Sequence, residues 1–154
     1  MTKILFVCHG NICRSPMAEF VMKKLVRDKG LENDFEIRSA ATSREELGNP
    51  VYPPARRKLM EHGISCSGKT AVQMTAADYD RYDCIVIMDS NNRRNIMRII
   101  GSDPDNKVRR LLDCTDRPRD VADPWYTGDF EQTWQDVSEG CSALLKEITA
   151  QNER

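Results

Sequence analysis

A cysteine, five intervening residues, an arginine and a serine stand together near the start of the chain, at Cys8, Arg14 and Ser15. They follow an apolar run, residues 4–7, and precede Pro16, a residue that favours a helix start. A strand, a tight loop and a helix N-terminus in this order form an anion cradle, because loop N–H groups converge on one point and the helix dipole adds positive charge. The guanidinium of Arg14 offers a planar fork for two phosphate oxygens. The same field favours thiolate over thiol at Cys8, so the sequence predicts a nucleophile beneath a bound phosphate.

A reaction at phosphorus that expels a basic oxygen also needs a nearby acid. The candidates in one late stretch of the chain are Asp113, Asp116, Asp120 and Asp123. We favour Asp123, because Pro124 fixes the backbone after it and the next two residues, Trp125 and Tyr126, place aromatic rings beside it. An aromatic wall suits a flat phenyl substrate. An Asp-Pro pair also begins ordinary turns, so this role depends on the cysteine loop.

The chain has 154 residues, a charged fraction of 31% and a formal net charge of −1. This length predicts one domain over residues 1–154 with a single core. The balanced charge argues against a general nucleic-acid or anionic-membrane binder. No secretory signal is apparent, and no apolar run approaches the roughly 18 residues that cross a bilayer. We therefore expect a cytoplasmic protein.

The six cysteines are scattered, no C-x-x-C pair occurs, and the only histidines are His9 and His62. This pattern disfavours a disulfide framework and a zinc site, and it indicates free thiols in a reducing compartment. Cys13 lies five residues after Cys8 in the same loop. We hypothesise that a reversible disulfide between them protects the thiolate. The alternative is that Cys13 is a small residue packed under the loop.

Strand-like and helix-like segments alternate along the whole chain. Strands are expected at 3–8, 35–40, 84–88 and 108–112, and helices at 15–28, 55–62, 76–82, 91–100 and 131–150. Ser15 is expected to cap the first helix, and Asn91 or Asn92 the helix after the third strand. Asp89 and Asn92 should face the same rim as the cysteine loop, as should the surface loop 42–54. Regular alternation predicts an α/β fold with a parallel sheet, helices on both faces, and a ligand at the carboxyl ends of the strands.

Together these residues resemble the low-molecular-weight protein tyrosine phosphatases. The loop 8–15 is followed in order by segments 16–19, 39–43, 48–50, 88–89 with Asn92, and 123–126, all similar to the family's motifs. The resemblance implies a flavodoxin-like, doubly wound sheet of four parallel strands. It also implies a phosphatase without metal or cofactor that hydrolyses phosphotyrosine monoesters through a phosphocysteine intermediate. Cys8 would be the nucleophile, Arg14 the phosphate ligand and Asp123 the proton donor.

The resemblance further implies roles for the residues around these three. Ser15 would hydrogen-bond the Cys8 thiolate and favour its departure from phosphorus, while Asn11 and Ser39 would hold the loop's shape. The predicted partners are phosphotyrosine-containing proteins and, in the loop, inorganic phosphate or other oxyanions. We expect a monomer or a weak dimer, because exposed Trp125 and Tyr126 would permit self-association. The residues expected to bind substrate are His9, Gly10, Asn11, Ile12, Cys13, Ser15, Trp125 and Tyr126.

Several alternatives stay open. Relatives that are protein arginine phosphatases carry threonine where this chain has Ile12, and an apolar Ile12 favours an aromatic ring over a guanidinium. An arsenate reductase of this architecture needs two further cysteines near the third strand, where only Cys84 is close. A cysteine phosphocarrier has no use for a hydrolytic acid, and a phosphotyrosine-binding module needs no nucleophile. Finally, the family often places an apolar residue at the pocket rim where this chain has Glu45 and Glu46. They could repel acidic phosphopeptides or form a solvated surface pair.

Overall fold

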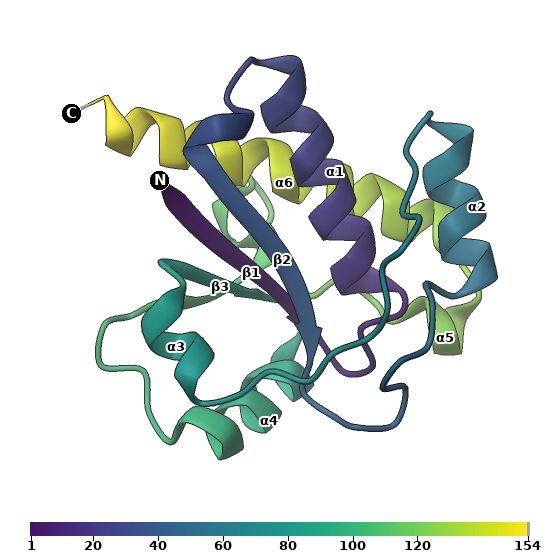
Figure 1. Cartoon of the computed structure of the whole chain (residues 1–154), viewed down its shortest axis with the longest axis horizontal. Coiled ribbons are helices and arrows are strands. Elements are labelled where there is room, and N and C mark those ends of the chain that lie inside the picture. The colour runs from purple at the N-terminus through teal and green to yellow at the C-terminus, as the bar shows by residue number, and fades with distance from the viewer. Residues whose placement is uncertain (154) are drawn as a thin grey trace.

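Four parallel strands form the centre of the molecule in the order β2-β1-β3-β4 (Figure 1). The computed structural model describes residues 1–153. The order changes direction at β1, which pairs with β2 on one side and with β3 on the other. This confirms the doubly wound sheet of four parallel strands that the resemblance implied, and it places the switch point of the sheet at β1. The strands are β1 (Thr2–Cys8), β2 (Phe35–Ala41), β3 (Cys84–Ile87) and β4 (Val108–Arg110).

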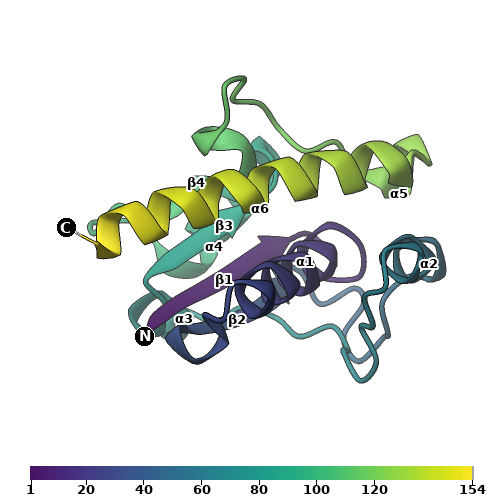
Figure 2. The same ribbon diagram turned by 90° about the horizontal axis from the view of Figure 1, so that it is seen from above.

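Helices cover both faces of the sheet, as the alternating pattern predicted (Figure 1). Helices α1 and α6 pack on one face with α2 beside them, and α3 and α4 pack on the other. Figure 2 shows the long α6 crossing the molecule from α5 to the C-terminal end. The helices are α1 (Arg14–Asp28), α2 (Pro53–Glu61), α3 (Ala77–Arg81), α4 (Ser90–Ile100), α5 (Pro124–Thr127) and α6 (Phe130–Asn152), with the 3-10 turns η1 (Glu32–Asp34) and η2 (Leu111–Cys114).

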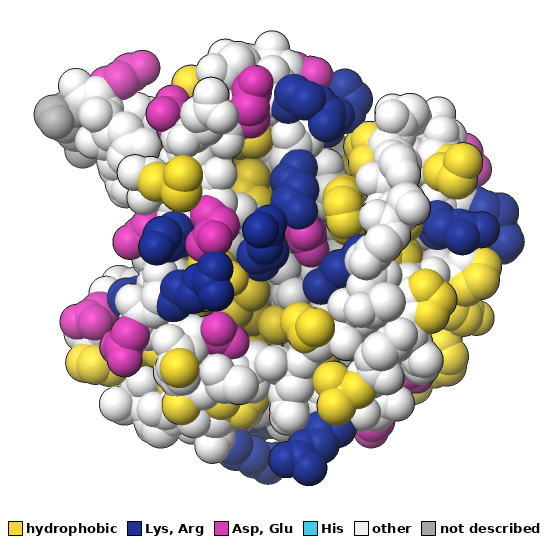
Figure 3. All heavy atoms as spheres, viewed as in Figure 1, with side chains coloured by type: hydrophobic (Ala, Val, Ile, Leu, Met, Phe, Trp, Pro, Cys, Tyr) yellow, Lys and Arg dark blue, Asp and Glu magenta, His cyan; other side chains and the backbone are white. Residues whose placement is uncertain are grey.

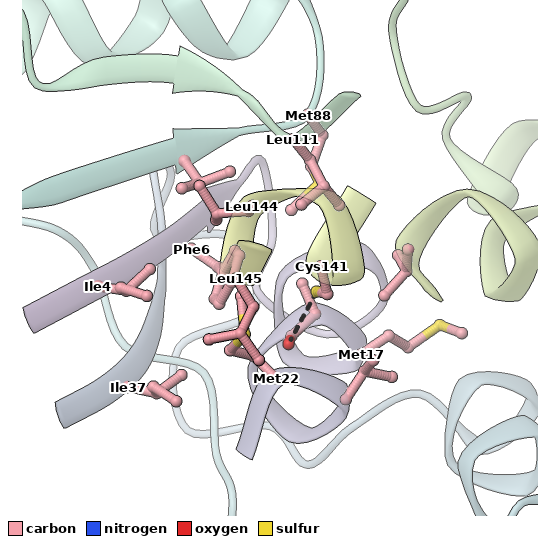
Figure 4. Close-up of a cluster of buried hydrophobic side chains, with 14 of the residues drawn as sticks. Ile4, Phe6, Met17, Met22, Ile37, Met88, Leu111, Cys141, Leu144 and Leu145 are labelled. Carbon is pink, nitrogen blue, oxygen red and sulfur yellow. Dashed lines mark hydrogen bonds between the residues drawn. The ribbon is translucent and has the colours of Figure 1, made fainter. Parts of the chain in front are cut away.

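Strand β1 is apolar on both sides because each side faces a helix layer. Ile4 and Phe6 join the cluster under α1 and α6, while Leu5 and Val7 join the cluster under α3 and α4. Figure 4 shows the first cluster, in which the Cys141 thiol points toward α1 and donates to the Ala18 carbonyl over 3.6 Å. Burying such side chains contributes roughly 1.5–3 kcal/mol each. The sheet is therefore a rigid base for the loops at its carboxyl edge.

Two predicted helix caps are wrong. Ser15 lies inside α1, which begins at Arg14, and its hydroxyl is held by other partners described below. Helix α4 is capped by Asp89, whose carboxylate accepts the Asn92 N–H over 2.8 Å. Asn92 closes this capping box by accepting the Asp89 N–H over 3.3 Å. Asp and Asn cap helices about equally well, so sequence alone could not choose between neighbouring candidates.

The surface is charged but mixed in sign. On the face shown in Figure 3, Lys and Arg side chains lie among Asp and Glu side chains over β2 and α1. Hydrophobic side chains gather at the right of the same view, where α2 and α5 lie. Among residues 1–153, no helix combines the length and the apolar character that a membrane span requires.

Candidate active site

The loop between β1 and α1 forms the floor of a pocket of about 120 Å³. The pocket lies at the carboxyl edge of the sheet, where the Cys8 carbonyl accepts the N–H of Thr42 over 2.9 Å. Its lining comes from three segments, namely the loop, residues 45–46 and residues 123–126. The lining residues are Cys8, His9, Gly10, Asn11, Ile12, Cys13, Arg14, Glu45, Glu46, Asp123, Trp125 and Tyr126. The structure therefore brings together every predicted site residue except Ser15, which lies directly behind Cys8.

The side chains of Ser15 and Cys8 are joined by a hydrogen bond. The Ser15 Oγ and Cys8 Sγ atoms lie 3.0 Å apart, and Asn11 contacts the same hydroxyl. The Asn11 Oδ1 accepts the Val72 N–H over 3.1 Å, which turns its Nδ2 toward the Ser15 hydroxyl at 2.8 Å. An amide nitrogen only donates, so the Ser15 oxygen accepts from Asn11 and keeps its one proton free to donate. When Cys8 is a thiolate it has no proton, and Ser15 is then the donor of the bond between them.

The same amide extends the network to a buried carboxylate. Asn11 Nδ2 also donates to the Ser39 hydroxyl over 2.9 Å, and Ser39 donates to Glu19 over 2.5 Å. Glu19 is only 3% exposed and also accepts from Lys23, while Lys69 approaches it at 3.8 Å. Burial lowers the pKa of Lys69, although the charge of Glu19 opposes this. A continuous chain of hydrogen bonds therefore links the Glu19 carboxylate to the Cys8 sulfur.

Asn11 also sets the curvature of the loop. Its φ is 60°, in the left-handed region that few residues other than glycine and asparagine adopt. The side chain is 1% exposed and all its hydrogen-bonding groups are used within the network. The strained backbone is therefore supported by three side-chain bonds.

Arg14 is buried beside the loop and braced by two partners. Its Nη1 donates to Asp89 over 2.7 Å and to the Val121 carbonyl over 2.8 Å. Its Nη2 faces Asp123 at 3.4 Å, a long contact that a phosphate oxygen could replace. Burial acts to lower the pKa of Arg14, but the charges of Cys8, Asp89 and Asp123 outweigh it and raise the pKa. The guanidinium is therefore a fixed positive charge at the cradle.

The two carboxylate oxygens of Asp123 have different partners. Oδ1 accepts the Trp125 N–H over 3.0 Å and caps the short helix α5. Oδ2 faces Arg14 and the cradle. The other candidate acids are occupied elsewhere or stand apart, since Asp113 and Asp120 pair with Arg110 and only Asp123 lines the pocket. Asp123 is therefore the one of these four aspartates that lies in the pocket.

Aromatic side chains form one wall of the pocket mouth. Trp125 is 53% exposed and Tyr126 is 84% exposed, as expected. The Trp125 ring packs on Tyr52 with a centroid distance of 4.9 Å, and Tyr52 in turn lies 6.1 Å from Phe130. The Tyr52 N–H donates to the Ile12 carbonyl over 2.9 Å, which ties this wall to the loop. Sequence reasoning did not identify Tyr52, whose only signal was an aromatic residue beside two prolines.

The remaining cysteines form no disulfide, and all of them except the partly exposed Cys114 are buried. All six thiols are free. Burial and the negative charges of Cys8, Asp123 and Glu46 raise the pKa of Cys13, so it is a neutral thiol that is 5% exposed. Cys13 packs with Ile12 and Ala71 under the loop. Among the described residues, no group of three or more His, Cys, Asp or Glu side chains could hold a metal ion.

A family model described as low molecular weight phosphotyrosine protein phosphatase matches residues 3–154. The chain belongs to this family. It is 39% identical over 150 residues to the low molecular weight protein-tyrosine-phosphatase YfkJ of Bacillus subtilis, covering 96% of each chain. It is 39% identical over 148 residues to the phosphatase of this family from Gallus gallus, covering 93% of each.

Solved structures agree with this assignment. The crystal structure of YfkJ superposes with a TM-score of 0.95 at 38% identity, covering 98% of this chain and 96% of that one. The crystal structure titled as a Drosophila arginine phosphatase gives a TM-score of 0.85 at 27% identity, covering 96% of this chain and 98% of that one. The family's fold therefore occurs with more than one named activity.

Within this family framework, the structure adds residues that the motifs did not reveal. Asp89 was expected at the rim, but its pairing with Arg14 was not. Glu19 belongs to segment 16–19, which resembles a family motif, but no role was assigned to Glu19 or to Lys69 from the sequence. In the structure the Lys69 Nζ atom lies 3.8 Å from the Glu19 carboxylate. His62, expected at a helix end, stacks on Trp134 with ring centroids 3.7 Å apart. It takes no part in the pocket.

Proposed function

We propose that the chain hydrolyses phosphotyrosine in proteins, with Cys8 as nucleophile and a phosphocysteine intermediate. The single observation that supports this best is the cluster of Cys8, Arg14 and Asp123 in one small pocket beside an aromatic wall. The loop amides, the N-terminus of α1 and Arg14 would bind the phosphoryl dianion or a free oxyanion. His9, Gly10, Ile12 and Cys13 would contribute to this cradle as part of its lining.

In the first step, the Cys8 sulfur attacks phosphorus in line with the bond to the phenolic oxygen. The P–S bond forms as the P–O bond breaks, and Asp123 gives its proton to the leaving oxygen. Asp123 Oδ2 would carry this proton, because Oδ1 caps α5. Arg14 and the loop amides stabilise charge on the equatorial oxygens throughout.

In the second step, the Asp123 carboxylate takes a proton from water as that water attacks phosphorus. The P–S bond breaks, inorganic phosphate forms, and the Cys8 thiolate returns. Ser15 favours this departure, because its proton is free to donate to the thiolate. A hydrogen bond to a charged group contributes about 1.5–3 kcal/mol. Trp125 and Tyr126 would hold the substrate ring by apolar contact.

We further propose that the protein works in the cytoplasm, which six free thiols support because such thiols persist in reducing compartments. The exposed rings of Trp125 and Tyr126 are compatible with a monomer or a weak dimer. Nucleic acid and membranes are not proposed as partners.

Phosphoarginine is the second candidate substrate, because one similar structure is titled an arginine phosphatase. Ile12 argues against it here. Its side chain is 8% exposed, lines the pocket and packs beside Cys13, so it presents an apolar surface where a guanidinium would need a hydrogen-bond acceptor.

The test is hydrolysis of phosphotyrosine and phosphoarginine peptides side by side, in EDTA, by wild type, Cys8→Ser and Asp123→Ala. We expect phosphotyrosine turnover that is lost in Cys8→Ser and falls strongly in Asp123→Ala. Turnover of phosphoarginine alone would overturn the argument from Ile12. Turnover of neither would reject the phosphatase proposal and reopen the phosphocarrier and reductase alternatives.

A further inference from the structure

Two glutamates form an acidic part of the pocket rim that the proposed chemistry does not use. Glu45 and Glu46 both line the pocket, together with Asp123. Arg14 is the one Lys or Arg among these lining residues, and it lies at the floor with 3% of its side chain exposed. A substrate residue that stays outside the floor therefore meets carboxylates, and His9 beside Glu45 is the one other lining residue that can carry positive charge.

Each of these carboxylates has a hydrogen-bond partner, and the Glu45 side chain is also 68% exposed to solvent. The Glu45 Oε2 atom lies 2.9 Å from the His9 Nε2 atom, which belongs to the cradle loop itself. The Glu46 Oε2 atom accepts from Asn49 Nδ2 over 2.7 Å, and a Cβ built on Gly10 would lie 3.4 Å from Glu46 Cγ. Glu46 thus packs directly on the loop.

The segment that carries the glutamates is anchored at both ends. Its start is joined to the cradle by bonds from the N–H and the hydroxyl of Ser43 to the His9 carbonyl, over 3.1 and 2.9 Å. Its end is joined by the N–H of Gly48, which donates to Ala71 over 3.0 Å. Side chains on a fixed segment lose little freedom when a ligand meets them, so their charge can select between substrates.

The size of the pocket places the neighbours of the phosphotyrosine at this rim. About 120 Å³ is well below the ~300 Å³ at which pockets begin to enclose drug-sized ligands, so one side chain fills it. The residues before and after that side chain remain outside. Glu45, with 68% of its side chain exposed, is positioned to meet them.

We infer that Glu45 and Glu46 direct this phosphatase to phosphotyrosines that have Lys or Arg beside them and against those that have Asp or Glu. This inference rests on the proposed function and names its substrate class. An exposed contact between opposite charges changes affinity by a factor of about 1.5–5. Attraction of a basic flank and repulsion of an acidic flank together should give about a tenfold difference in kcat/KM.

The experiment compares three phosphotyrosine peptides that differ only in the residues on either side, which are Lys, Gln or Glu, with phenyl phosphate as a substrate without flanks. The enzymes are wild type, Glu45→Gln, Glu46→Gln, the double variant and Glu32→Gln. Glu32 is an exposed carboxylate on η1, away from the pocket, and is the matched control. The readout is the ratio of kcat/KM for the Lys and Glu peptides within each enzyme, which does not depend on the fraction of active protein.

We expect the wild-type ratio to be about ten, to fall toward one in the double variant and to stay at about ten in Glu32→Gln. Raising the ionic strength to about 0.5 M should lower the wild-type ratio toward one, because exposed charges are screened. A wild-type ratio near or below one, or a ratio that the double variant leaves unchanged, would overturn the inference while turnover itself upheld the proposed function. If wild type hydrolysed none of the three peptides and did not hydrolyse phenyl phosphate either, both the inference and the proposed function would be overturned.

Discussion

The hydroxyl of Ser15 lies 3.0 Å from the sulfur of Cys8, and it donates its proton to that sulfur whenever Cys8 is a thiolate, which has no proton of its own. Asn11 Nδ2 donates to the same hydroxyl at 2.8 Å and holds it in place. A thiolate at the floor of the cradle therefore has a donor prepared for it before substrate binds.

Ser15→Ala removes this donor with little change in shape. Alkylation of Cys8 by iodoacetamide at pH 6 and the turnover number should both fall about 10- to 100-fold, the effect of one hydrogen bond of about 1.5–3 kcal/mol to a charged group. Labelling quenched at a series of times and read by mass spectrometry measures the alkylation rate, and steady-state kinetics measure the turnover number. Ser138→Ala is the control, because the buried Ser138 hydroxyl has no partner among the described residues. Equal labelling rates in Ser15→Ala and wild type would contradict the assigned proton direction.

Asp123→Asn tests the acid. It should lower kcat for a phosphotyrosine peptide about 10²- to 10⁴-fold, because proton transfer to the phenolate is lost. The cap on α5 survives, since an Asn side-chain oxygen can still accept the Trp125 N–H. Asp120→Asn, which changes an aspartate that pairs with Arg110, is the control. If both variants lost activity equally, the choice among the late aspartates would be wrong.

Asp89→Asn separates two roles of the Asp89 carboxylate, which are its ion pair with Arg14 and its cap on α4. Asparagine caps about as well as aspartate, so the cap is kept, while the charge and the accepting oxygen opposite Arg14 are lost. We expect the free energy of unfolding to fall by about 2–3 kcal/mol, less than for a fully buried pair because Asp89 is partly exposed. Inorganic phosphate should restore more stability to this variant than to wild type, since it offers Arg14 another anion.

Urea denaturation with and without phosphate measures both effects. Asp28→Asn, in an exposed pair with Lys24, should cost only about 0.3–0.5 kcal/mol and is the control. A loss in Asp89→Asn no larger than in this control would show that Arg14 does not depend on Asp89.

Asn11 and Asn106 form a matched pair, because both have positive φ, 60° and 53°. Glycine relieves the backbone at either site, but only at Asn11 does it also remove three buried side-chain bonds. Asn11→Gly should therefore lower the unfolding free energy by about 2–4 kcal/mol, while Asn106→Gly changes it by less than about 1 kcal/mol. Similar losses in chemical denaturation would argue against a structural network under the loop.

Alkaline pH should destabilise the fold through buried thiols. Burial raises the pKa of Cys84 to about 11 and, with the Glu147 hydrogen bond, that of Cys114 to about 12, from an ordinary value of 9.0. The folded state holds these protons longer than the unfolded state, so their contribution is complete below about pH 9 and is lost as pH rises toward 11–12. Thermal unfolding of wild type and a Cys84→Ala, Cys114→Ala variant between pH 8 and 11 measures this. We expect the melting temperature to fall less steeply with pH in the variant than in wild type. Parallel curves of melting temperature against pH would show that these two thiols do not cause the loss of stability.

Much of this site could be predicted because its parts are local in sequence. Cys8, Arg14 and Ser15 share one loop, and Asp123 is marked by the proline and two aromatic residues that follow it. The parallel sheet with helices on both faces followed from regular alternation, and its doubly wound arrangement followed from the resemblance. Ser15 was misassigned as a cap because Ser-Pro at a helix start usually caps, whereas here its hydroxyl is taken by Asn11 and Cys8.

The parts that could not be predicted depend on tertiary contacts. Arg14 meets Asp89 across 75 residues of sequence, and Asn11 meets the Val72 N–H across 61. A polar residue on a helix, such as Glu19, is expected to face solvent, and only the fold shows that Ser39 and Lys69 surround it. No spacing in the sequence encodes such partners.

The most direct test of the central claim is to trap the covalent intermediate. In Asp123→Ala, 2,4-dinitrophenyl phosphate should still phosphorylate Cys8, because this leaving group needs no acid, while attack by water is slowed by loss of the base. Rapid quenching in alkaline denaturant, followed by proteolysis and mass spectrometry, locates the phosphoryl group. We predict one phosphoryl group on the peptide that contains Cys8, formed in a burst that matches the enzyme concentration and is absent in Cys8→Ser. A phosphoryl group on another residue, or release of dinitrophenol with no phosphorylated enzyme at any time, would contradict the account.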